Sequence, residues 1–135
     1  MDTKMKPIWV IFTCIALPFF TANNALASGS DIQSYSQTLL LKNWVLSRCL
    51  AKAYPSKQAK IDAQLSASGY LEFGNVPIEA YDEGELLVDQ YLKRTYSGVI
   101  KNSYNTMKCI DLFHSKALEA LTQKYTANIN PPLHN

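Results

Sequence analysis

The chain has 135 residues, of which 47% are apolar and 18% charged, with 13 basic and 11 acidic side chains. So small a charge imbalance gives no support for a nucleic-acid partner or an anionic membrane surface. The length suits one domain around one hydrophobic core.

The first 27 residues have the pattern of a cleavable secretory signal. Lys4 and Lys6 form a short positive region, residues 8–20 are largely apolar, and Ala25-Leu26-Ala27 provides a small-x-small cleavage site. The apolar run is too short to span a bilayer as a helix. We therefore expect cleavage after Ala27 and export of residues 28–135 as a single domain.

Cys14 lies inside this signal and does not fit a lipidation site. The bulky Phe12 precedes it where a lipoprotein signal has a small residue, and too little apolar sequence comes before it. The exported chain is therefore expected to be unanchored.

Two helices are predicted in the first half of the exported chain. Apolar residues at three- and four-residue steps indicate a helix over about residues 31–54, capped by Ser30 or Asp31 and ended by Pro55. A second helix over about 57–71 has Ser56 as its cap.

The second helix has an expected buried line of Ile61, Leu65 and Ser68, with small alanines beside it. Gly74 suits the left-handed position that often follows a helix.

A third helix is predicted from Pro77 to about Arg94, because proline is favoured in a first turn. Its expected buried line is Ile78, Tyr81, Val88 and Leu92. An acidic run with no base between residues 72 and 92 overlaps it: Glu72, Glu79, Asp82, Glu83, Glu85 and Asp89. This run is either a solvated helix face or a docking surface for a basic partner.

Residues 96–104 form a polar loop that is longer than most connections between helices. Such a loop is either a mobile connector or a binding element. A fourth helix then runs from Asn105 or Thr106 to about Tyr125. Its expected buried line is Met107, Ile110, Phe113 or His114, Ala117 and Leu121.

No stretch alternates with the period of a strand, so the predicted fold is all-α, a small bundle of four main helices. Its core is too small for all of its larger aromatic residues. Some of these are therefore expected at the surface or in an interface: Trp44, Tyr70, Phe73, Tyr91, Tyr96 and Tyr104.

Export leaves two cysteines, Cys49 and Cys109, and an even number in an exported chain predicts one disulfide. An antiparallel pairing of the first and fourth helices would bring them together. The bond would close a loop of about 60 residues and contribute about 4 kcal/mol to stability in the chain-entropy model.

Cys109 and His114 are also five positions apart and could suggest a thiol or metal site. Five positions on a helix are about 140° apart around its axis, so these side chains would point to different faces. Paired Cys or His motifs with metal spacing are absent from the sequence. We therefore expect no catalytic residue, metal or cofactor, and a partly buried or interface position for His114.

Three segments together resemble a known family, the type VI secretion amidase immunity proteins of the fourth class. They are LSRCLAKAY (46–54), SASGYLEFGNVPIEAYDEG (66–84) and NTMKCIDLFHSKALEAL (105–121), and they occur in the family's order. The family's cysteine pair falls at Cys49 and Cys109.

The resemblance implies a periplasmic, non-enzymatic inhibitor of a papain-like peptidoglycan amidase that cuts the D-glutamyl–diaminopimelate bond. It implies a homodimer in a two-plus-two complex, in which a protruding loop plugs the catalytic cleft. The expected plug residues here are Ser97, Gly98, Val99, Lys101, Asn102 and Ser103. The expected docking charges are Asp82, Glu83, Glu85 and Asp89.

Val99, Ile100 and Lys101 do not match the family's loop pattern and leave the exact plug residues open. Two other functions also remain open at this stage. One is a small exported hydrolase that uses His114, and the other is a helical binder of a small ligand or of another wall enzyme.

Overall fold

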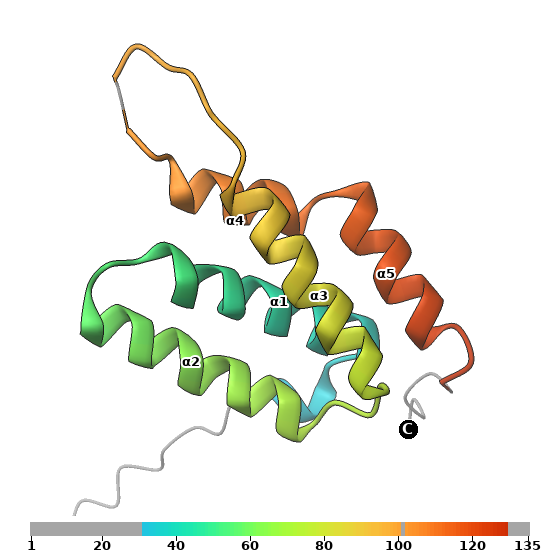
Figure 1. Ribbon diagram of the computed structural model, residues 1–135. Helices are drawn as coiled ribbons and strands as arrows, with labels where there is room; N and C mark the ends of the chain where they lie inside the picture. Colours follow the sequence, from blue (N-terminus) through green and yellow to red (C-terminus); the bar gives the residue numbers. More distant parts are fainter. Residues whose placement is uncertain (1–30, 101, 130–135) are drawn as a thin grey trace, which may run out of the picture.

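The computed structural model describes residues 31–100 and 102–129, all of whose regular structure is helical (Figure 1). The elements are the 3-10 turn η1 (Asp31–Ser34) and the helices α1 (Gln37–Ala53), α2 (Lys57–Glu72), α3 (Ile78–Leu92), α4 (Asn105–Phe113) and α5 (Lys116–Thr126). The predicted all-α class is confirmed, with five α-helices where four were expected. The expected signal and cleavage site lie outside the described residues. Within the described part of the chain, no helix has both the length and the apolar character needed to cross a bilayer.

Helix α1 is the centre of the bundle and packs against each of the other four α-helices. Its buried residues therefore lie on several sides of the helix and not on one stripe: Leu40, Leu41, Trp44, Val45, Ser47, Cys49, Ala51 and Ala53. Trp44, one of the aromatics considered for the surface or an interface, is buried, with its ring edge-to-face against Tyr81 at 4.9 Å between centroids. Tyr91 is buried as well, whereas the other large aromatics singled out from the sequence keep part of their surface exposed.

Helix α1 begins later than predicted, because Ser36 and not Ser30 or Asp31 caps it. The Ser36 hydroxyl accepts a hydrogen bond from the Leu39 N–H at 3.2 Å. The first helical residue, Gln37, then holds the α2–α3 connection. Its amide donates to the Phe73 carbonyl at 3.2 Å and accepts from the Asn75 N–H at 2.6 Å.

Helix α2 packs on α1 through small residues. Ala63 and Ala67 are its buried positions, while Leu65 is 67% exposed and Ile61 also faces outward. The predicted buried line was wrong because the bulkiest residues of this helix do not make the contact. The Ser56 cap is confirmed, but no described glycine has a positive φ, so the expected left-handed role of Gly74 was wrong as well.

Helix α3 runs parallel to α1 and approaches it most closely at Gly84. A Cβ atom added at Gly84 would lie 2.9 Å from the Val45 Cγ2 and 3.3 Å from the Trp44 Cζ3. Tyr81 and Val88 are buried as predicted, whereas Ile78 is exposed. At about 100° per residue, Ile78 lies roughly 120° around the helix from Gly84, away from the α1 contact.

The predicted fourth helix is two helices, α4 and α5, which meet at His114 and Ser115. The Ser115 hydroxyl accepts from the Leu118 N–H at 3.1 Å and so starts a new helix. Helix α4 buries Lys108, Cys109 and Leu112, so Met107 and Ile110 of the predicted line are exposed, and α5 buries Leu118 and Leu121. His114 is exposed, so it is not partly buried, and the other expected position, in an interface, stays a prediction.

The expected antiparallel pairing of α1 with α4 and the predicted disulfide are both confirmed. Cys49 and Cys109 are bonded, with 5.6 Å between their Cα atoms, and both are fully buried. Near the other end of α1, the hydroxyls of Thr38 and Thr126 share a hydrogen bond at 2.8 Å, which fixes the end of α5 beside the start of α1.

Gly84→Ala is expected to lower the free energy of unfolding by about 1–2 kcal/mol, because overpacking against Val45 outweighs the gain in helix propensity. Gly69→Ala is the matched control. Its added Cβ would meet only the Ile32 Cδ1 at 3.9 Å, an ordinary contact, so it should stabilise by up to about 1 kcal/mol. Chemical denaturation measures both changes. Equal effects of the two substitutions would contradict the proposed close packing at Gly84.

Candidate functional site: the loop end of the bundle

The connection between α3 and α4 projects from one end of the bundle (Figure 1). Val99 is fully exposed and Ile100 is 72% exposed at its tip. The other predicted plug residues that the structure describes, Ser97, Gly98, Asn102 and Ser103, are exposed in the same segment. Lys101 lies outside the described residues. The structure thus brings the described plug candidates together on one protrusion.

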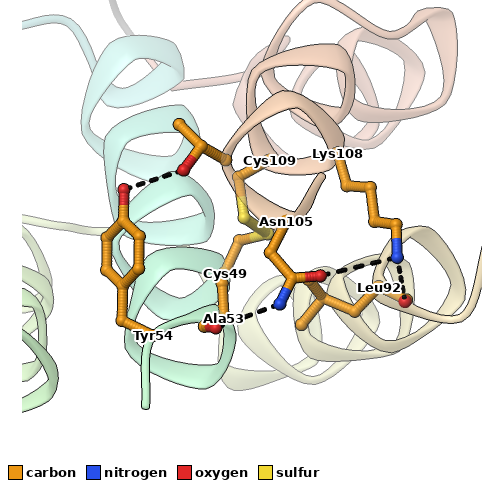
Figure 2. The surroundings of a disulfide bond; sticks show 8 residues. Cys49, Ala53, Tyr54, Leu92, Asn105, Lys108 and Cys109 are labelled. Carbon is orange, nitrogen blue, oxygen red and sulfur yellow. Dashed lines mark hydrogen bonds between the residues drawn. A yellow bond between two sulfur atoms is a disulfide. The ribbon is translucent and has the colours of Figure 1, made fainter. Parts of the chain in front are cut away.

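Both roots of this loop are fixed by two polar residues from the first turn of α4 (Figure 2). Lys108 is only 6% exposed, and its ammonium donates to the Leu92 carbonyl at 3.1 Å and to the Asn105 Oδ1 at 3.5 Å. The Asn105 amide in turn donates to the Ala53 carbonyl at 3.1 Å. Since Leu92 ends α3 and Ala53 ends α1, the pair joins three helix ends at the base of the loop.

A cation at a helix C-terminus is favourable because the last carbonyls lack partners and carry partial negative charge. Lys108 supplies this charge to α3 from a neighbouring helix. The buried Cys49–Cys109 bond lies one residue further along α4 and holds the same turn against α1. The loop therefore leaves and re-enters the bundle at fixed points.

Two tyrosines act within or beside the loop. The Tyr96 hydroxyl donates to the Asp111 carboxylate at 2.5 Å, and this hydrogen bond raises the pKa of Tyr96. The Tyr104 hydroxyl donates to the Ile100 carbonyl. Side chains of α4 thus support the first half of the loop, and Tyr104 supports its tip.

A hollow of about 480 Å³ lies at the base of the loop. It is lined by Ala53, Tyr54, Pro55, Asn102, Ser103, Tyr104, Asn105, Thr106 and Met107. Met107 and Ile110, which are both about half exposed, add apolar surface on α4. Exposed apolar side chains around a polar loop are typical of a surface that binds another protein.

Three of the four predicted docking charges form ion pairs with other helices. Glu85 pairs with Arg48 and Lys52 of α1, and Asp89 pairs with Lys52 at 2.7 Å. Arg48 and Lys52 are one helical turn apart, as are Glu85 and Asp89, so the two parallel helices present matching charges.

Glu83, the third of these charges, accepts from Lys124 of α5 at 2.7 Å and from the Tyr125 hydroxyl at 2.8 Å. Asp82 is exposed and has no ion pair within residues 31–100 and 102–129. The acidic surface on α3 is therefore largely balanced by bases that lie far away in the sequence.

The residues considered for chemistry do not assemble. Cys109 has no free thiol, because its sulfur is bonded to Cys49. His114 is exposed with its ring edge-on to Phe113, 5.2 Å between centroids. In the part of the chain that the structure describes, no three His, Cys, Asp or Glu side chains gather to hold a metal ion.

Sequence reasoning located the loop but missed the residues that position it. Lys108 and Asp111 were not singled out, Asn105 was considered only at the start of a helix, and Tyr104 only as one of several aromatics for the surface or an interface. The position of Lys108 in the sequence could have identified it. A lysine in the first turn of a helix is disfavoured by the helix dipole unless another group interacts with its charge.

The ion pairs on α3 are expected to make stability depend on acid pH. The hydrogen bond from Lys52 lowers the pKa of Asp89, and hydrogen bonds from Lys124 and Tyr125 lower the pKa of Glu83. Around and below about pH 4, the unfolded chain therefore binds more protons than the folded chain. The free energy of unfolding is expected to fall as the pH drops through this range and through the lowered pKa values of Asp89 and Glu83.

Lys52→Gln should reduce this acid dependence, because Asp89 loses the partner that lowers its pKa. The effect should not exceed about 1 kcal/mol for so exposed a pair. Lys60→Gln on the outer side of α2 is the control, since Lys60 forms no ion pair with the described residues. Denaturation between about pH 6 and 2 gives the comparison. Identical pH profiles for the two variants would contradict the role of Lys52.

The comparisons with known proteins agree with this geometry. Residues 39–122 match the family described as type VI secretion system (T6SS) amidase immunity protein, Tai4. No curated protein sequence matches the chain.

Solved structures of several relatives are similar to the chain. The effector–immunity system Tae4/Tai4 of Salmonella typhimurium includes a chain that is 42% identical, with a TM-score of 0.68, and the match covers 71% of this chain and 95% of that one. The Tae4–Tai4 complex of Enterobacter cloacae has one at 33% identity and a TM-score of 0.63, covering 70% and 97%. A structure of type VI-secreted toxins and self-resistance proteins from Serratia marcescens shares the fold at 24% identity, with a TM-score of 0.66 and coverage of 92% and 88%. The chain belongs to the Tai4 family of type VI secretion amidase immunity proteins.

Proposed function

We propose that the chain is a periplasmic immunity protein that binds a type VI-secreted peptidoglycan amidase of the Tae4 kind and blocks its active site. The observation that carries the proposal is the 42% identity over 95% of a chain from the Salmonella typhimurium effector–immunity structure. The enzyme's expected substrate is the D-glutamyl–diaminopimelate bond of the wall peptide. The chain acts by binding and not by catalysis.

The projecting loop is the part that enters the enzyme's cleft. An inhibitor that plugs a cleft needs a narrow segment that stands clear of its own body, as the segment around Val99 and Ile100 does. It also gains affinity if little ordering is needed on binding. The contacts of Lys108 and Asn105 at the loop base meet this second requirement.

Val99 and Ile100 are the anchors that this loop offers. They are the large apolar side chains at its tip, and moving an exposed aliphatic side chain out of water into a cleft contributes roughly 1.5–3 kcal/mol to binding. Small polar neighbours, Ser97, Asn102 and Ser103, supply hydrogen bonds around them. Lys101 completes the proposed plug.

The carboxylates of α3 contribute steering more than contact energy. Glu83, Glu85 and Asp89 are partly neutralised by their ion pairs. Asp82 carries the exposed charge of this surface. A basic enzyme would therefore be attracted weakly, in a way that salt screens.

Export and assembly complete the proposal. Cleavage after Ala27 would release the chain to the periplasm, and the buried disulfide suits such an oxidising compartment. The family resemblance supports a homodimer and a two-plus-two complex with the enzyme, in which the second subunit adds a contact surface. The mass of the complex by light scattering measures this stoichiometry.

Replacing both Val99 and Ile100 by serine is expected to weaken inhibition of the amidase at least about tenfold, because two apolar anchors leave the interface. Hydrolysis of a purified wall peptide, with increasing amounts of residues 28–135, gives the inhibition constant. Leu65→Ser on α2 is the matched control, since Leu65 is about as exposed as Ile100.

Full inhibition by the doubly substituted loop would contradict the plug. If the unaltered chain binds no amidase and instead inhibits another wall hydrolase, such as a lysozyme, the proposed partner is wrong.

Asp82→Asn is expected to slow association with the amidase about two- to threefold at low salt and to have less effect at high salt. Asp62→Asn on α2, away from the acidic surface, is the control. Stopped-flow or surface-based kinetics measure the rate constants. An association rate constant that changes neither with Asp82→Asn nor with ionic strength would argue against electrostatic steering.

A further inference from the structure

Tyr104 is the residue with an unusual backbone in the plug loop. It has φ 51° and ψ 34°. Among the non-glycine residues of the described ranges 31–100 and 102–129, it is the one with a positive φ. A residue other than glycine is strained in this region unless its surroundings compensate. Tyr104 precedes the first turn of α4 but makes no side-chain cap to it. Its ring instead contacts other residues of the loop.

The ring of Tyr104 folds back into the loop and lies against Gly98. A Cβ atom added at Gly98 would be 2.9 Å from the Tyr104 Cζ and 3.5 Å from its Cε2, with the hydroxyl oxygen closer still. A Cβ atom so close to the hydroxyl oxygen and to Cζ would force the Tyr104 ring to move. The phenol therefore occupies the space that any side chain at position 98 would need.

The hydroxyl of the same ring donates to the Ile100 carbonyl. Tyr104 thus contacts both sides of Val99, at Gly98 through its ring and at Ile100 through its hydroxyl. The side chains of Val99 and Ile100 remain exposed. One side chain holds the turn, and the two apolar residues at the tip stay free for a partner.

We propose that Tyr104 is the positioning residue of the plug, that Gly98 is required to make room for its ring, and that the partner cleft takes the two aliphatic side chains of Val99 and Ile100. This inference rests on the proposed function and deepens it. A loop that already has its bound shape avoids the loss of affinity that comes from a small population of the competent conformation. Gly98 then acts inside the free protein and not against the wall of the enzyme's cleft.

A double-mutant cycle tests this assignment. Gly98→Ala and Tyr104→Leu should each weaken binding to a catalytically inactive amidase about tenfold, with most of the loss in the association rate constant. The double variant should bind no more weakly than Tyr104→Leu alone, because the added methyl group no longer meets a ring. If the loss of affinity in the double variant equals the product of the two single losses, Gly98 contacts the enzyme's cleft directly. That result would overturn the proposal.

Measurements on the free protein separate this inference from the proposed function. Amide hydrogen exchange in residues 98–103 should be faster in Gly98→Ala and in Tyr104→Leu, with the thermal midpoint unchanged. Tyr35→Leu, at the other end of α1, is the matched control and should leave loop exchange unaltered. Unchanged loop exchange in the Tyr104 variant would overturn the positioning role, whatever the protein binds.

Tyr104→Phe gives a finer readout, since it keeps the ring and loses the hydrogen bond to Ile100. It should lie between the wild type and Tyr104→Leu in both exchange and association rate. A phenylalanine variant no better than leucine would contradict the ring's part in the mechanism. If the wild type itself fails to bind any Tae4-type amidase, the proposed function fails while the exchange result still decides the role of Tyr104.

Discussion

The bond between Cys49 and Cys109 is the constraint on which the rest of the structure depends. It joins the central helix to the first helix after the projecting loop, across 60 positions of sequence. Closing a loop of that length contributes about 4 kcal/mol in the chain-entropy model, a large share of the stability of a small domain. Because the bond is buried beside Asn105 and Lys108, it also fixes the place where the loop returns to the bundle.

The helical class and the disulfide could be predicted, because each depends on a local pattern or on a count. The contacts between helices could not be predicted as well, because apolar periodicity assumes that the bulkiest residues make them. Here α2 approaches α1 through Ala63 and Ala67, and α3 does so at Gly84. Ser115 likewise divides a continuous apolar pattern into two helices by capping the second.

The candidate site shows a similar division. The length and polarity of residues 96–104 were enough to locate the loop, and the structure shows it projecting. The acidic run was identified as well, but its partners Arg48 and Lys52 lie 37 residues earlier on a parallel helix. Matching four-residue spacings on the two helices were present in the sequence. Nothing in one segment alone, however, shows which other helix will face it.

The residues that fix the base of the loop have an evolutionary consequence. Asn105, Lys108 and the disulfide lie outside the tip, and the bundle core makes no use of Val99 or Ile100. Substitutions at those two positions can therefore accumulate with little penalty on folding. When the sequence of the amidase diverges between bacterial lineages, its immunity protein can thus keep binding through changes at a few tip positions, while the helical bundle stays the same.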